Sequence, residues 1–161
     1  MLVVIVVGLI YGLFLSNMKR YGEKQFNLNL MSLPSYLQSL QKDNALSVVC
    51  IDACRSCFLF VDGLKSAEVD PFVDDSLRLY RHDRFTGSEA IELTPLFDEE
   101  GREYEVCFRY DLYSDGSSSE MMVEYGESVV DYAGYFTQPR RYASLEEAIE
   151  EKNAFIEKVL K

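Results

Sequence analysis

The chain of 161 residues contains no Trp, one His and few basic side chains. It has 16 Lys and Arg against 27 Asp and Glu, so its formal net charge is −11 at pH 7. Because a surface that binds a phosphate backbone is normally basic, this balance argues against nucleic acid as a partner and is compatible with a basic protein. A single His excludes a His-rich metal site and leaves only one residue that could act as an imidazole acid or base. No nucleophile elbow, phosphate-binding glycine loop or metalloprotease helix is present, so the sequence does not favour an enzyme.

The longest apolar run is N-terminal, where residues 1–16 carry no charged side chain. As a helix this run would extend about 24 Å, somewhat less than the roughly 30 Å of a bilayer core, and Asn17 and Met18 could lengthen it. We therefore predict a membrane anchor over residues 1–18. Two alternatives stay open. Residues 2–7 are rich in β-branched side chains and could form a buried strand, or the run could be a signal peptide, although it lacks a basic n-region and a small-residue cleavage site.

Basic residues follow the apolar run, at Lys19, Arg20 and Lys24, and none precedes it. The positive-inside rule then predicts a single-pass membrane protein whose C-terminal domain is cytoplasmic. Four Cys agree with that location, because thiols stay reduced in the cytoplasm. We read residues 19–24 as a polar junction and residues 25–161 as an acidic α+β domain.

The first half of this domain has signals for short strands and helices. Alternation predicts a strand over residues 25–31, and Pro34 with apolar residues at helical spacing predicts a helix over 32–42. Two further strands are expected over 46–52 and 57–61, the second of them closed by an Asp-Gly turn. A short helix over 71–75 should precede a strand that contains Leu77 and Leu79.

The apolar runs in the second half of the domain predict an antiparallel β-meander. Its four strands are expected around residues 91–93, 104–112, 121–125 and 129–136, with connections too short for a crossover helix. A capping box at Ser144 then begins a C-terminal amphipathic helix. Packing of the helix on the meander would give a two-layer domain.

The cysteines offer a second kind of site. Cys50, Cys54 and Cys57 could bind zinc as thiolates, with a fourth ligand from His82 or Cys107. The C-x-x-C spacing of the second and third also matches thioredoxin-like redox sites, although the residues that follow favour a strand over the helix such sites use. The remaining interpretation is that these Cys are small side chains buried in two adjacent strands.

Two groups of charged residues are candidate contacts with a protein. Glu103 and Glu105 share one strand face, opposite Tyr104, where they would bind a cation or a basic partner, or face solvent. Arg81 and His82 belong to a locally basic stretch that would contact an acidic group or lie on an exposed edge.

The leading prediction is thus a membrane-anchored, non-enzymatic binding or accessory protein. It would contact another protein, basic or membrane-embedded, through its acidic α+β domain, and no cofactor is expected. The alternative is a cysteine-dependent redox or zinc-binding protein that uses Cys50, Cys54 and Cys57.

Overall fold

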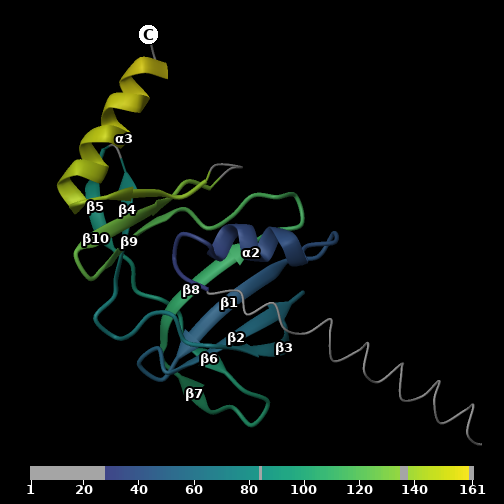
Figure 1. Ribbon diagram of the computed structural model, residues 1–161. Coiled ribbons are helices and arrows are strands. Elements are labelled where there is room, and N and C mark those ends of the chain that lie inside the picture. Colours follow the sequence, from purple (N-terminus) through teal and green to yellow (C-terminus); the bar gives the residue numbers. More distant parts are fainter. Residues whose placement is uncertain (1–27, 84, 135–137, 160–161) are drawn as a thin grey trace, which may run out of the picture.

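The computed structural model describes residues 28–83, 85–134 and 138–159 (Figure 1). The predicted anchor and junction lie outside these ranges. Within them, no helix is both long enough and apolar enough to cross a membrane. The described residues form antiparallel sheets with two helices, which confirms the α+β class.

Four strands form sheet A in the order β3-β2-β1-β8. They are β1 (Leu46–Ile51), β2 (Ser56–Val61), β3 (Leu64–Val69) and β8 (Val106–Leu112). β1 is the apolar central strand and, like β2, was predicted. β3 was not, because its first five residues are all exposed and show no apolar alternation.

Five strands form sheet B in the order β11-β10-β9-β4-β5. They are β4 (Arg78–Asp83), β5 (Gly87–Ala90), β9 (Met121–Tyr125), β10 (Ser128–Tyr132) and β11 (Arg140–Tyr142). Strands β9, β10 and β11 form a meander. The predicted first half of the meander is wrong, because β8 pairs with β1 rather than β9 and residues 91–93 belong to no strand.

The main core lies between one face of each sheet and helix α2 (Leu33–Leu40), so the domain contains a second sheet that the two-layer prediction lacked. Leu33 and Leu37 of α2 are fully buried, which confirms the predicted helix with shorter bounds. Tyr132 is 2% exposed, and its hydroxyl donates a 2.6 Å hydrogen bond to the carbonyl of Leu30. This bond ties the chain before α2 to sheet B.

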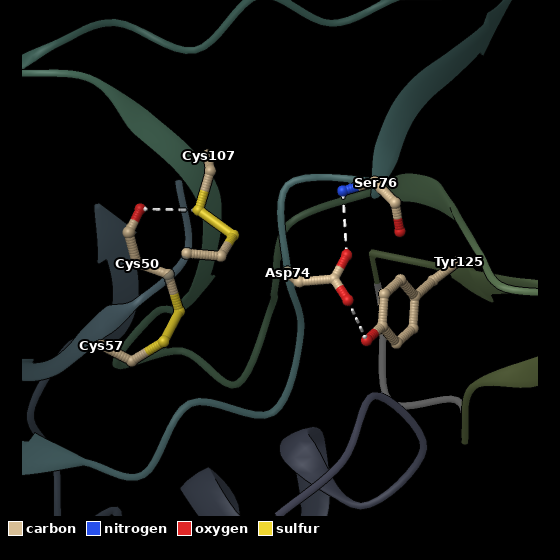
Figure 2. Close-up of a disulfide and its surroundings, with 7 residues drawn as sticks. Cys50, Cys57, Asp74, Ser76, Cys107 and Tyr125 are labelled. Carbon is tan, nitrogen blue, oxygen red and sulfur yellow. Dashed lines mark hydrogen bonds between the residues drawn. A yellow bond between two sulfur atoms is a disulfide. The ribbon is translucent and has the colours of Figure 1, made fainter. Parts of the chain in front are cut away.

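Two predicted elements are not found among the described residues. Residues 28–31 contain no strand and instead turn into α2, and residues 71–75 contain no helix. In the second segment the carboxylate of Asp74 accepts hydrogen bonds from the Ser76 N–H (2.9 Å) and the Tyr125 hydroxyl (3.1 Å), as Figure 2 shows. These bonds pair the Asp74 carboxylate with the loop backbone and tie the loop to β9.

Helix α3 (Leu145–Val159) covers the other face of sheet B, where Ala148 packs in one cluster with Met122 and Val129. Its predicted start is confirmed, since the Glu147 N–H donates to the Ser144 hydroxyl over 3.2 Å. The Glu147 carboxylate accepts from the Ala143 N–H, one residue before the position of a standard capping box. The C-terminal part of α3 projects past the sheet (Figure 1).

Candidate binding site

A small hairpin lies over the outer face of sheet A, the face turned away from the main core. It consists of β6 (Leu96–Phe97) and β7 (Glu103–Tyr104), in which Leu96 and Tyr104 are paired. These two side chains pack against an apolar cluster of sheet A. The buried members of that cluster are Val49, Ile51 and Val106, with Phe58 and Phe60 half-buried beside them.

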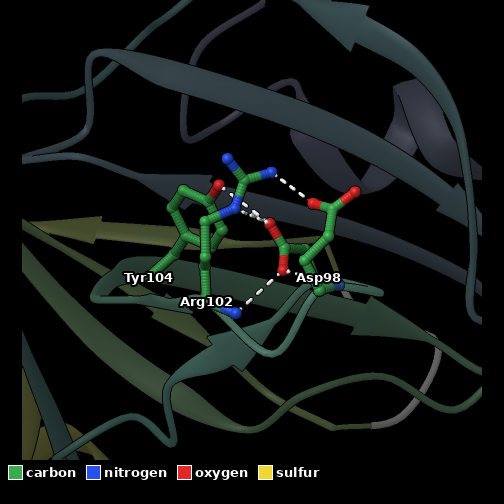
Figure 3. A network of polar contacts seen from close by, with 4 residues as sticks. Asp98, Arg102 and Tyr104 are labelled. Carbon is green, nitrogen blue, oxygen red and sulfur yellow. Dashed lines mark hydrogen bonds and ion pairs between the residues drawn. The ribbon is translucent and has the colours of Figure 1, made fainter.

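Asp98 organises the turn of this hairpin (Figure 3). Its carboxylate accepts hydrogen bonds from the backbone N–H of Glu100 (3.0 Å) and Arg102 (2.8 Å), from Arg102 Nε (2.7 Å) and from the Tyr104 hydroxyl (3.1 Å). Arg102 also pairs with the Glu100 carboxylate. The turn is therefore held in one conformation by a single carboxylate, with Gly101 supplying the left-handed residue at φ 78°.

We expect the pKa of Asp98 to lie below its ordinary value of 3.8. Partial desolvation raises this pKa, but the hydrogen bonds from Arg102 and Tyr104 outweigh it. Because the folded pKa is below the unfolded one, the contribution of Asp98 to stability is present above the unfolded pKa and is lost as the pH falls through the folded pKa. An NMR titration of the Asp98 carboxyl carbon in the full-length protein measures this, and a midpoint at or above 3.8 would contradict the network.

A cleft of about 400 Å³ separates the turn of the hairpin from the aromatic side chains of β2. Among the residues that line it, we call the half-buried Phe58 and Phe60 its floor and the exposed Glu99 its rim. Three carboxylates and two cations line it, which gives a net formal charge of −1; the five are Asp98, Glu99, Glu100, Lys65 and Arg102. Arg102 is paired with the first and third carboxylates, whereas Glu99 is exposed and has no side-chain partner among the described residues.

The floor already holds one positive charge. The ammonium of Lys65, from β3, lies 3.4 Å from the centroid of the Phe58 ring. A ring face attracts a cation through its quadrupole. The cleft thus combines an apolar aromatic surface, a cation-binding ring and a carboxylate rim, which together suit a side chain that is both cationic and partly apolar.

The glutamates predicted from the sequence flank this cleft without lining it. Glu103 and Glu105 are exposed and Tyr104 is half-buried, but the strand predicted to carry all three is interrupted: Glu103 and Tyr104 belong to β7, and Glu105 lies between β7 and β8. Glu105 lines a neighbouring cleft of about 550 Å³, shared with the β4 residues Arg78 and Tyr80.

Arg81 and His82 lie on β4 in sheet B and are not brought together with the glutamates. The two ring nitrogens of His82 contact the Ser88 hydroxyl at 3.1 Å and the Asn153 side-chain oxygen at 3.0 Å. Half-buried His82 therefore connects β4 with β5 and α3.

The four cysteines form two disulfides, so the prediction of reduced thiols is wrong. Cys50 pairs with Cys57 across β1 and β2, and Cys54 pairs with Cys107 of β8 (Figure 2). In this state no sulfur is a thiolate that could ligate zinc, and His82 belongs to the other sheet. No group of metal-binding side chains occurs in the portion of the chain that the structure describes. The burial expected of Cys50, Cys54 and Cys57 is confirmed.

The Cys54–Cys107 disulfide is attached to a turn with an uncommon backbone conformation. Asp52, Ala53 and Cys54 have φ values of 56°, 53° and 61°, so three successive residues with side chains are left-handed. The register of β1 and β8 shifts at Cys50/Ile51, and Cys107 is the extra residue at that irregularity. The disulfide joins the turn to this point, next to Ile51 in the cleft.

Sequence reasoning identified Glu103 and Glu105, which flank the cleft, but missed the residues that line it. A usable signal was present in β2, where Phe58 and Phe60 alternate with the buried Cys57 and Leu59. No local signal places Lys65, because its position depends on the pairing of β3 with β2. No protein-family model matches the chain, and neither the curated proteins nor the solved structures contain a significant match to it.

Proposed function

We propose that this protein is a membrane-anchored, non-enzymatic accessory protein that binds a basic protein partner through the cleft between the β6–β7 hairpin and sheet A. The observation that carries the proposal is the contact of the Lys65 ammonium with the Phe58 ring, in a cleft that Glu99 also lines with a carboxylate that has no side-chain partner among the described residues. The same surroundings suit a Lys or Arg side chain of another protein.

The volume of the cleft and the net charge of the protein support a protein partner. A cleft of about 400 Å³ accommodates one or two side chains of a docked segment. Arg and aromatic side chains are the usual anchors of protein interfaces. A net charge of −11 attracts a basic protein over distances up to the screening length and speeds association at low salt.

The disulfides change the proposed location of the domain. Two disulfides favour an oxidising compartment, whereas the three basic residues after the apolar run favour the cytoplasm. We give the disulfides more weight, because they involve every Cys of the chain, and propose that residues 1–18 anchor a domain outside the cytoplasm. Alkaline carbonate extraction should leave the full-length protein in the membrane pellet, and thiol alkylation of unreduced cell extracts should label no Cys. Release from the pellet would contradict the anchor, and labelling of all four Cys would contradict the location.

Binding through the cleft is tested with a pair of substitutions that remove two negative charges from its rim. We expect Glu99→Gln/Glu100→Gln to weaken binding of a fluorescein-labelled Phe-Arg-Phe peptide by roughly three- to tenfold, because two carboxylates near the cation are lost. Fluorescence anisotropy with the full-length protein in a non-ionic detergent measures the affinity. The peptide in which citrulline replaces Arg has the same shape without the charge, and should bind more weakly to the unmodified protein.

The matched control is Glu146→Gln/Glu150→Gln on the exposed side of α3, which changes the net charge equally but lies outside the cleft. This control should leave the affinity within about twofold, since exposed charges beyond a Debye length are screened. Equal losses in both variants, or equal binding of the Arg and citrulline peptides, would show that the cleft is not a cation site.

A further inference from the structure

We infer that Lys65 occupies the place that the partner's cation takes, so that Lys65 competes with the partner and sets the affinity of the cleft. The inference rests on the proposed function and adds to it the chemistry of recognition: the preferred occupant is an Arg next to an apolar side chain.

Lys65 is held weakly. It belongs to β3, the outermost strand of sheet A, and its residue is exposed. The pairing of β2 with β3 shifts between Leu59 and Phe60, which sets Lys65 opposite Phe60 while its ammonium reaches the ring of Phe58. No carboxylate forms a salt bridge with Lys65 within the described residues; the ring is the contact that the structure records for its ammonium.

Two cations do not share one ring face, because they repel each other at such short distances. A partner's cation must therefore displace the Lys65 ammonium, whose flexible stem lets it move into water. A guanidinium would bind more tightly than an ammonium in this cleft, because its plane can stack on Phe58 and its N–H groups can donate to the Glu99 carboxylate. The apolar neighbour of that Arg would contact Phe60 and Leu96, which also line the cleft.

The test is Lys65→Met, which keeps the length of the side chain and removes its charge. We expect this variant to bind the fluorescein-labelled Phe-Arg-Phe peptide about five times more tightly than the unmodified protein, because one competing cation–ring contact is gone. Its affinity for the citrulline peptide should stay the same. Lys158→Met, at an exposed position of α3, is the control for the change in net charge and should bind both peptides as the unmodified protein does.

Three results would overturn the inference. If Lys65→Met binds the Arg peptide equally or less tightly, Lys65 is not a competitor. If it binds both peptides more tightly by the same factor, Lys65 only obstructs the cleft and its charge is irrelevant. If the unmodified protein does not distinguish Arg from citrulline, the proposed cation site is itself wrong, and the role of Lys65 is wrong with it. A thermal unfolding curve for Lys65→Met verifies that the variant is folded.

Discussion

The Cys54→Ala/Cys107→Ala variant is expected to lose about 4 kcal/mol of unfolding free energy, as the chain-entropy model of cross-links gives for a loop of this length. The two Cys are separated by 53 residues, so their disulfide restricts the unfolded chain strongly. Urea unfolding under non-reducing conditions measures the loss. A variant as stable as the unmodified protein would show that the disulfide contributes nothing to the fold.

The Cys50–Cys57 disulfide supplies the comparison. Cys50 and Cys57 are separated by only 7 residues. The same model gives about 2 kcal/mol for the loss of this bridge in Cys50→Ala/Cys57→Ala. Equal losses, or the reverse order, would contradict this assignment of roles.

Lys152→Met is expected to lower the free energy of unfolding by about 3 kcal/mol, because it leaves a buried carboxylate without its partner. The side chain of Asp131 is only 7% exposed, and its Oδ1 accepts a 2.8 Å hydrogen bond from Lys152 Nζ. The same ammonium lies 3.4 Å from the carboxylate of Glu120, which is 61% exposed. We therefore expect the lower end of the range for broken buried pairs, since water can partly reach this site.

Two further variants separate the ion pair from simple loss of packing. Asp131→Asn/Lys152→Met should recover part of the loss, because the uncompensated charge is removed as well. Arg140→Met breaks the exposed pair with Glu151 and should cost less than about 1 kcal/mol. If Lys152→Met costs no more than Arg140→Met in urea unfolding, the Asp131 pair is not a stabilising feature of the interface between α3 and sheet B.

Local signals explain which elements could be predicted. The beginning of α3 is marked by Ser144 and Glu147, and the beginning of α2 by Pro34. The apolar runs of β1 and β2 are short and bounded by polar turns. Strand β8 alternates clearly, but its pairing with β1 is a contact between residues about 60 positions apart, on which alternation carries no information.

Less of the candidate site than of the fold could be predicted from local sequence signals. Four Cys allow three pairings in addition to a reduced state, and nothing in their spacing selects one. The orientation inferred from three basic residues then led to thiols where the structure has disulfides. Glu103 and Glu105 could be singled out because they alternate with Tyr104 and Val106. The cleft beside them could not, because Phe58 and Lys65 meet only through the pairing of β2 and β3.

Photocrosslinking in cells that express the full-length protein tests binding through the cleft most directly. A benzophenone amino acid in place of Phe97, which is 59% exposed on the hairpin, should crosslink one protein through a peptide that contains Arg or Lys beside an apolar residue. Glu99→Gln/Glu100→Gln should reduce that product. The same probe in place of Phe85, 90% exposed between β4 and β5, should not form it. Crosslinks to acidic or uncharged peptides, or the same product from both positions, would contradict the account.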